Sequence, residues 1–388
     1  MIQTPEAQAL TAYLETYRDT YLNELRALCA IECPTASKAG VDAAGAWVRS
    51  WVQARGWELR SWPDATSGDG LLATVRGSGQ LRILMAAHLD TVYPVGIAAE
   101  RPMTIDGDVL RGPGSADNKS GLLSALYAMA ALEDLGLLAP IGTLSLMCGG
   151  DEETDMRASL AMMSALAPEY DMVLVLEAGR ENGDIVGARK GGGNYVLEEF
   201  GRAAHAGVEP EKGAHAVLAL AHHTIALQAL NGLRPSVTLN VGVVQGGTVP
   251  NAVPDYARAT IDARVFAPED IEPLVTAIRE VVAREVVPGV RAELSGGWGA
   301  PPMARTPAIA ALAALAEACA AELGFSTRAA ATGGVSYANY FARLGLPVLD
   351  GLGPVGGLDH SPQEYILVSS IVPRTALLAL LALRAAQR

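Results

Sequence analysis

Two histidines and four carboxylates fall at or just beyond the ends of segments that the sequence predicts to be strands. They are His88, Asp117, Glu152, Glu153, Glu177 and His360. Two imidazoles with several carboxylates suit a pair of zinc-like ions that share one bridging carboxylate. Such a pair binds a water between the ions and lowers the pKa of this water towards about 7. One more carboxylate must stay off the metal to accept the water's proton, and the adjacent Glu152 and Glu153 offer one residue for each task.

Each signal also has an ordinary structural interpretation when taken by itself. Asp117 could be a helix N-cap, since aspartate favours that position. The acidic run Asp151-Glu152-Glu153 could be a solvated helix start that the helix macrodipole favours, although adjacent acids repel one another unless a cation or water screens them. A histidine two residues before an aspartate, as in His88-Leu-Asp90, is common by chance. The combination is a far stronger signal for a metal site than any member.

Short apolar runs, of the kind that fill buried strands, position these side chains. The runs are Leu81–Ala87, Thr143–Cys148, Met172–Leu176 and Pro347–Leu352. In open α/β sheets, ligands bind at the carboxyl edge of the strands. Residues two apart on an extended segment share a face, so Asp90 can hold the far nitrogen of His88 and determine its tautomer. Asp117 lies in the glycine-rich turn Gly112–Gly121, where a predicted helix over Ser120–Leu135 begins.

The remaining pattern predicts an α/β protein with an inserted second domain, because 388 residues are too many for one compact core of ordinary size. Between Gly191 and about Gly297, strands and helices follow in the order β-α-β-β-α-β, which suggests a ferredoxin-like α+β insert. We expect a catalytic domain over residues 1–190 and 301–388, and a lid or dimerisation domain over residues 191–300. Further helices are expected at Ala7–Ala30, Val41–Arg55, Gly213–Leu230, Glu269–Glu285, Ala308–Leu323 and Thr375–Leu383.

Composition narrows the classes of partner and compartment. The formal net charge of −13 argues against nucleic acid or an anionic membrane surface as a partner. The first residues lack the basic and apolar regions of a signal peptide, and no stretch reaches the roughly 18 apolar residues of a membrane span. Four scattered cysteines without metal-finger spacing fit free thiols in a reducing compartment. We therefore expect a cytoplasmic protein that binds neither nucleic acid nor membranes.

Four of the six histidines lie in the predicted insert. His205 stands in Ala-Ala-His-Ala-Gly, a loop of small residues that leaves the imidazole exposed or in a cleft. His215, His222 and His223 fall on a predicted helix, so we expect them to be surface or packing residues.

Six segments carry a resemblance to one family of dinuclear zinc metallopeptidases. They are His88-Leu-Asp90-Thr, Gly112-Pro-Gly-Ser-Ala-Asp117-Asn-Lys, Asp151-Glu-Glu-Thr, Arg202-Ala-Ala-His205-Ala-Gly, Pro250-Asn251-Ala-Val-Pro and Gly351-Leu-Gly-Pro-Val-Gly-Gly-Leu-Asp-His360-Ser-Pro. These resemble segments of glutamate carboxypeptidase, aminoacylase, acetylornithine deacetylase and succinyl-diaminopimelate desuccinylase. The likeness covers nearly the whole chain in the right order and is closest to the glutamate carboxypeptidase branch.

The resemblance implies a mixed-sheet catalytic domain with two Zn²⁺ ions, although the same ligands accept Co²⁺ or Mn²⁺. By this likeness one ion is held by His88, Asp117 and Glu177, and the other by Asp117, Glu153 and His360. Asp90 would orient His88, Glu152 would be the general base and acid, and the peptide bond after Asp117 would be cis.

The same likeness implies a homodimer that forms through the insert. His205 of one protomer would then reach the partner's site and stabilise the oxyanion, with Asn251 nearby. The implied reaction is hydrolysis of an amide bond in an N-acyl amino acid or a short peptide. Glu152 would take a proton from the attacking water and pass it to the leaving nitrogen.

Two departures from the family pattern affect the predicted substrate. Ala300 stands where relatives commonly have an arginine that binds the substrate's α-carboxylate, and Tyr337 stands where they usually have aspartate. Substrate binding is therefore expected from Asn251, Arg264, Gly334 and Tyr337, with Tyr337 in a pocket wall. The leaving group would then be aromatic, amidated or otherwise uncharged rather than simply glutamate, unless Arg305 replaces the missing arginine.

Other functions compete with the carboxypeptidase interpretation. An N-deacylase or amidase could act on a substrate that lacks a glutamate α-carboxylate. A non-catalytic binding protein is a further alternative, although all five expected ligands and Glu152 are present. A phosphatase would need more phosphate donors than this sequence offers.

Overall fold

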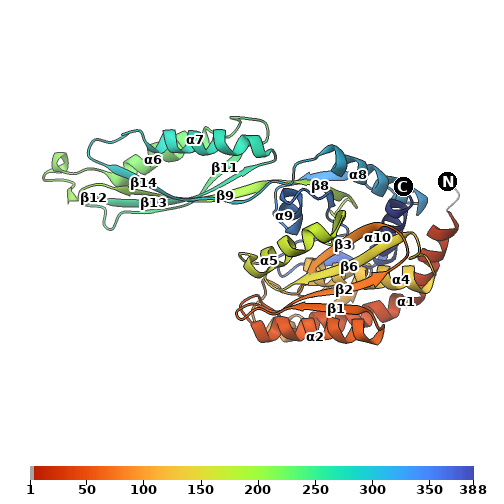
Figure 1. Cartoon of the computed structure of the whole chain (residues 1–388). Coiled ribbons are helices and arrows are strands. Elements are labelled where there is room, and N and C mark those ends of the chain that lie inside the picture. Colours follow the sequence, from red (N-terminus) through yellow and green to blue (C-terminus); the bar gives the residue numbers. More distant parts are fainter. Residues whose placement is uncertain (1–3) are drawn as a thin grey trace. The chain divides into compact units, whose positions relative to one another are not determined.

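A computed structural model describes residues 4–388 of the chain (Figure 1). The chain divides into two compact units. The first extends to Gly187 and continues over Arg305–Ala331 and Ser336–Arg388, and the second comprises Ala188–Ala304 and Thr332–Val335. The expected insert over residues 191–300 lies within the second unit, but Thr332–Val335 were not expected there. They join it because the main-chain N–H of Lys190 donates to the carbonyl of Thr332 at 3.0 Å.

A six-stranded mixed sheet forms the centre of the first unit, with the strand order β1-β2-β6-β3-β7-β16. The strands β3, β6, β7 and β16 run parallel, and β1 and β2 complete the sheet in antiparallel pairings. The bounds are Glu58–Trp62 (β1), Gly70–Arg76 (β2), Leu81–His88 (β3), Ile141–Gly149 (β6), Met172–Val175 (β7) and Val348–Leu349 (β16). The predicted apolar runs are therefore strands, although only Val348–Leu349 of the run Pro347–Leu352 pair in this sheet.

Three long helices pack against one another in this unit. They are α1 (Pro5–Ala30), α4 (Ser120–Asp134) and α10 (Val368–Ala386). Residues 120–132 of α4 are buried without exception, so this helix is apolar all round. The helices α2 (Lys38–Ala54), α5 (Arg157–Leu166), α8 (Pro307–Glu322) and α9 (Tyr337–Arg343) complete the unit, with the single turn α3 (Ile97–Glu100).

The helix α10 is longer than the helix Thr375–Leu383 that the sequence predicts. Its 19 residues are long and apolar enough to cross a membrane by length and composition. However, 78% of its most apolar window is buried inside the chain, as in the core helix of a globular domain. The earlier expectation that no stretch reaches this length is therefore wrong, because the first two turns, which contain Ser369, Ser370 and Pro373, continue the helix.

The second unit has the predicted β-α-β-β-α-β order. Its sheet has the antiparallel order β11-β13-β9-β14, and α6 and α7 cover one face (Figure 1). Alternate residues of β13, from Ala257 to Val265, point into the core, which lies between this face and the helices. The bounds are Gly191–Phe200 (β9), Ala216–Gln228 (α6), Thr238–Gly246 (β11), Tyr256–Val265 (β13), Ile271–Val282 (α7) and Arg291–Ala300 (β14).

Several short strands lie outside the two main sheets. One small sheet has the order β17-β18-β5-β4, and two pairs of strands are β8-β15 and β10-β12. The bounds are Thr104–Asp106 (β4), Val109–Arg111 (β5), Ile185–Arg189 (β8), Ala204–His205 (β10), Ala252–Val253 (β12), Ala329–Thr332 (β15), Gly356–Gly357 (β17) and Tyr365–Leu367 (β18). The pairing of β18 with β5 brings the segments around His360 and Asp117 together.

Candidate metal centre

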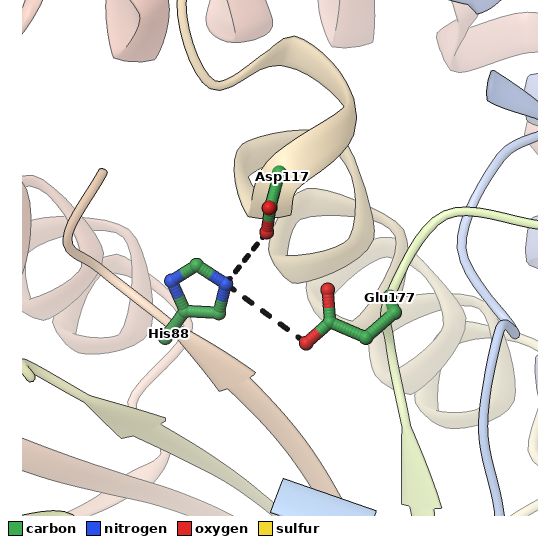
Figure 2. Close-up of side chains that lie close together, drawn as sticks. All are labelled: His88, Asp117 and Glu177. Atoms are coloured by element: carbon green, nitrogen blue, oxygen red, sulfur yellow. Dashed lines mark hydrogen bonds and ion pairs between the residues drawn. The ribbon is translucent and has the colours of Figure 1, made fainter. Parts of the chain in front are cut away.

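Three predicted ligands meet at the carboxyl edge of the central sheet. His88 is the last residue of β3, Asp117 lies in the turn before α4, and Glu177 follows β7 (Figure 2). The Nε2 atom of His88 lies 2.9 Å from Oδ1 of Asp117 and 3.9 Å from Oε1 of Glu177. One ligand atom from each residue lies within 4.8 Å of the others, which is close enough for one ion to contact all three.

A second group of three shares Asp117 with the first. The Nε2 atom of His360 lies 3.1 Å from Oδ2 of Asp117 and 3.1 Å from Oε2 of Glu153. Asp117 thus offers one carboxylate oxygen to each histidine, which is the arrangement that a bridging ligand needs. The other oxygen of Glu153, Oε1, is buried without a hydrogen-bond partner among the described residues. The donor types and this unsatisfied oxygen fit a pair of zinc-like ions.

The carboxylates strongly affect the protonation of both histidines. Hydrogen bonds to Asp117 and Glu153 raise the pKa of His360 to about 11. Burial opposes protonation of His88, but hydrogen bonds to Asp117 and Asp90 raise its pKa well above the usual value. Burial would raise the pKa of Asp117, but its hydrogen bonds with His360 and His88 lower it. In the metal-free chain these contacts favour the protonated form of both imidazoles.

Asp90 connects the first histidine to the acidic segment. The Nδ1 atom of His88 lies 3.0 Å from the main-chain oxygen of Asp90 and 3.4 Å from its carboxylate. The same carboxylate accepts hydrogen bonds from the hydroxyl of Thr35 at 2.6 Å and from the main-chain N–H groups of Glu152 and Glu153, each at 3.1 Å. Asp90 can thus orient His88, and it also holds the main chain that carries the proposed base and one ligand.

The three adjacent acids have three different surroundings. Asp151 is buried and accepts hydrogen bonds from the N–H groups of Ala158 and Ser159 in the first turn of α5. Glu153 belongs to the second ligand group, whereas Glu152 belongs to neither group. Burial raises the pKa of Glu152 well above its usual value, and the charges of Glu177 and Asp117 act in the same direction. Only Asp151 has the helix-start role that the alternative interpretation gave to the whole run.

Tyr337 was predicted to lie in a pocket wall, but the structure buries it in the interior instead. Its side chain is fully buried in the first unit, and its hydroxyl lies 2.7 Å from the Oγ atom of Ser159. Ser159 in turn donates to Asp151. The tyrosine therefore supports the segment that carries the acidic residues, because its hydroxyl contacts Asp151 through Ser159.

The predicted residues of the insert form two separate clusters. The pairing of β10 with β12 places His205 opposite Ala252 and thus next to Asn251, and both His205 and Asn251 are exposed. Arg264 binds the carboxylate of Asp262 at 2.9 Å and the carbonyl of Gly333 at 2.6 Å, while Arg189 donates to the carbonyl of Gly334.

Ala300 lies in register with Arg264 across the sheet of the insert, because both pair with Gly192 of β9. Arg305 belongs to the first unit and donates to the carbonyl of Ala329 at 3.2 Å.

The other histidines of the insert are surface or packing residues, as predicted. His215 caps α6, His222 is exposed, and His223 is buried against Glu199.

One buried carboxylate beside the centre, Glu364, was not predicted from the sequence. It accepts hydrogen bonds from the main-chain N–H groups of Gly114, Ala116 and Asp117 at 2.7–3.0 Å. Burial raises the pKa of Glu364 to about 7, although these N–H groups and Tyr93 oppose the shift. A single glutamate in a loop carries no spacing signal, and its position four residues after His360 was the only available hint. The cis peptide bond expected between Asp117 and Asn118 is present.

Comparison with known proteins agrees with this geometry. Residues 84–384 match the sequence model of peptidase family M20/M25/M40. Carboxypeptidase G2 of Pseudomonas sp. (strain RS-16) is 28% identical over 361 residues, which cover 91% of this chain and 86% of the relative. A succinyl-diaminopimelate desuccinylase of Rhizorhabdus wittichii is 27% identical over 360 residues, with coverages of 88% and 92%.

Solved structures show the same fold over nearly the full length of the chain. The structure of aminopeptidase PepT from Bacillus cereus superimposes with a TM-score of 0.82 at 23% identity, covering 96% of this chain and 99% of that one. An M20 family metallo-carboxypeptidase from Sulfolobus solfataricus gives a TM-score of 0.71 at 16% identity, with coverages of 95% and 99%. The resemblance stated from the sequence motifs is confirmed, and the chain belongs to peptidase family M20/M25/M40.

Proposed function

We propose that this metallopeptidase-family hydrolase cleaves an amide bond in N-acyl amino acids or short peptides, with Glu152 as general base. The observation that carries the proposal is the division of Asp117 between His88 and His360, at 2.9 and 3.1 Å, beside Glu152, a half-buried glutamate that belongs to neither ligand group. When bound, two zinc-like ions would polarise the amide carbonyl and lower the pKa of a nearby water. The donor set equally suits Co²⁺ or Mn²⁺.

Glu152 performs the proton transfers in this proposal. Its carboxylate takes one proton from the water as the water's oxygen bonds to the amide carbon. It then returns that proton to the amide nitrogen as the carbon–nitrogen bond breaks, so that an acid and an amine leave. Asp90 supports both roles of the segment, because it binds the main-chain N–H groups of Glu152 and Glu153. His205, with Asn251 beside it, is proposed to stabilise the oxyanion.

Two substrate classes are compatible with this chemistry. The name of Carboxypeptidase G2 suggests a substrate with a free α-carboxylate. The second class lacks that carboxylate, and an observation favours it. The usual arginine position is Ala300, and Arg264 is already paired with Asp262 at 2.9 Å. Unless this pair opens, no bidentate clamp is available from Arg264.

Matched substrate pairs distinguish these classes. Zinc-loaded protein would be given N-acyl amino acids, each as the free acid and as the α-amide, and amine release would be followed with Glu152→Ala as the blank. Preference for free acids would favour a carboxypeptidase, and Arg264→Ala should then raise KM. Equal or faster turnover of the amides would favour an amidase or deacylase. Absence of turnover above the blank on every pair would overturn the proposed function and favour a binding protein.

We also propose that the chain forms a homodimer through the insert in the cytoplasm. The insert exposes large apolar side chains on one helix and on the edge strand β11. These include Leu218 and Ile225 of α6 and Val243 and Val244 of β11, with exposures of 46–71%. An unpaired edge strand and an exposed apolar helix face both favour association with a second copy. Light scattering of the purified chain tests this proposal.

A further inference from the structure

A buried carboxylate joins the two segments that carry the bridging ligand and the second histidine. Glu364 is only 2% exposed and lies four residues after His360. Its Oε2 atom accepts from the N–H of Gly114 at 2.9 Å, and its Oε1 atom accepts from the N–H groups of Ala116 and Asp117 at 2.7 and 3.0 Å. One side chain thus binds the main chain on which Asp117 stands.

The local fold explains why Glu364 reaches this loop. Glu364 immediately precedes β18, and the loop over residues 112–117 follows β5. These two strands pair, with Tyr365 opposite Arg111, so the residues beside their ends lie close together. Tyr93 adds a third connection, since its hydroxyl donates to the carbonyl of Ser361 at 2.9 Å. The segment around His360 is therefore attached to the loop that carries Asp117 and to the segment that follows Asp90.

The two ligand groups depend on this attachment to different degrees. His88 ends the buried strand β3, and Glu177 is the second residue after β7, so parallel sheet pairing positions both. His360 lies in an irregular loop, has a positive φ of 62°, and exposes 54% of its side chain. Loss of the contacts of Glu364 should therefore displace His360 relative to Asp117 more than it displaces His88 or Glu177.

We propose that Glu364 is a positioning residue that holds the bridging Asp117 in register with His360, and so maintains the second ligand group selectively. The inference rests on the proposed function only in that both ligand groups must bind metal. Glu364 does not belong to either group and acts through the main-chain N–H groups. Partners behind the direct ligands commonly change metal affinity by tenfold to a hundredfold when they are replaced.

Metal titration of the full-length chain tests the inference. Metal-free wild type, Glu364→Gln and Glu364→Ala would be titrated with Co²⁺ against a competing chelator, and the visible absorption of bound Co²⁺ would report each site. In Glu364→Ala we expect the first equivalent to bind as in wild type and the second to bind about tenfold to a hundredfold more weakly. Glu364→Gln should be intermediate, because its amide keeps one acceptor oxygen but places a donor against the N–H of Gly114.

The control replaces a buried carboxylate away from the metal centre. Glu199→Gln in the insert removes the charge of a residue that pairs with His223, and it should leave both equivalents unchanged. Equal weakening of both equivalents, or unchanged binding in both Glu364 variants, would overturn the inference. If Glu364→Ala does not fold, as circular dichroism would reveal, the Gln variant decides. Failure of wild type to bind two equivalents would instead contradict the proposed function.

Discussion

Asp117 gives one carboxylate oxygen to His88 and the other to His360, so a single residue favours the protonated form of two imidazoles. In the metal-free chain these contacts favour the protonated form of both rings, whereas a metal ion binds the neutral ring. The residues that suit a metal pair are thus the same ones that hold protons in its absence. Metal binding and proton release must therefore be coupled at this site.

Proton release on metal binding is the first expected outcome. The pKa of His360 is raised to about 11, so at pH 7 the ring is protonated and must lose its proton to bind a metal ion. Calorimetric titration with Zn²⁺ at pH 7 in buffers of different ionisation enthalpy should show net release, which declines as the pH approaches 11. His222→Ala, an exposed histidine of the insert, should leave this release unchanged. A heat that is independent of the buffer would contradict this account of the protonation states.

Tyr337 gives a second prediction at the residue scale. The hydroxyl of Tyr337 is buried and hydrogen-bonded to Ser159. Tyr337→Phe should therefore lower the free energy of unfolding by about 1 kcal/mol without changing KM for an uncharged substrate. Urea denaturation and steady-state kinetics would measure the two quantities. Tyr340→Phe on the same helix is the control, since this residue is only half-buried. A large rise in KM with unchanged stability would restore Tyr337 to the substrate pocket.

At the scale of elements, parallel strands that end side by side explain most of the site. His88 and Glu177 could be predicted as neighbours because continuous apolar runs identify buried strands, and parallel strands share their carboxyl edge. The short strands near the site have no such apolar run. The strands β5 and β18 have three residues each, and they are stabilised by tertiary pairing rather than by a periodic pattern. Without them, the contact between Glu364 and the loop of Asp117 could not be predicted.

The start of α5 allows a test of the acidic segment as a structural element. Asp151 satisfies two N–H groups of the first turn of α5, at 2.7 and 3.0 Å, within the interior. Asp151→Asn should lower the free energy of unfolding of the metal-free chain by about 1–2 kcal/mol. Asp108→Asn removes the charge of a comparable but exposed cap at the start of α10 and should cost less. Equal effects of the two substitutions in urea denaturation would show that burial adds nothing to the Asp151 cap.

At the scale of the whole molecule, the chain consists of a metal-binding unit and an inserted unit that carries His205 and Asn251. The order of elements in the insert was predictable, because its amphipathic helices and alternating strands have clear periods. The return of residues 332–335 to the second unit was not predictable. It depends on contacts with Lys190, Arg189 and Arg264, which lie far away in the sequence.

The proposed homodimer makes a prediction about mixtures of two inactive variants. If His205 acts in the partner's site, a mixed dimer of His205→Ala and Glu152→Ala retains one site with both residues intact. Random mixing of subunits should therefore restore about a quarter of the wild-type rate of amide hydrolysis, since half of the dimers are mixed and each has one complete site. Mixing Glu152→Ala with Glu153→Ala serves as the control, because both residues belong to the site of their own chain and the mixed dimer therefore contains no complete site. A rate in the His205→Ala and Glu152→Ala mixture that does not exceed this control would show that His205 acts within its own chain.

The central claim is that two metal ions share Asp117 and that Glu152, which binds neither, transfers the protons of amide hydrolysis. The most direct measurement adds Zn²⁺ in steps to metal-free wild type and Glu152→Ala, and records bound metal and amine release from N-acyl amino acids together. We predict that both proteins bind two equivalents and that only wild type hydrolyses the substrates, with full activity reached at the second equivalent. Hydrolysis by Glu152→Ala at the wild-type rate, or full wild-type activity with one equivalent bound, would contradict the account.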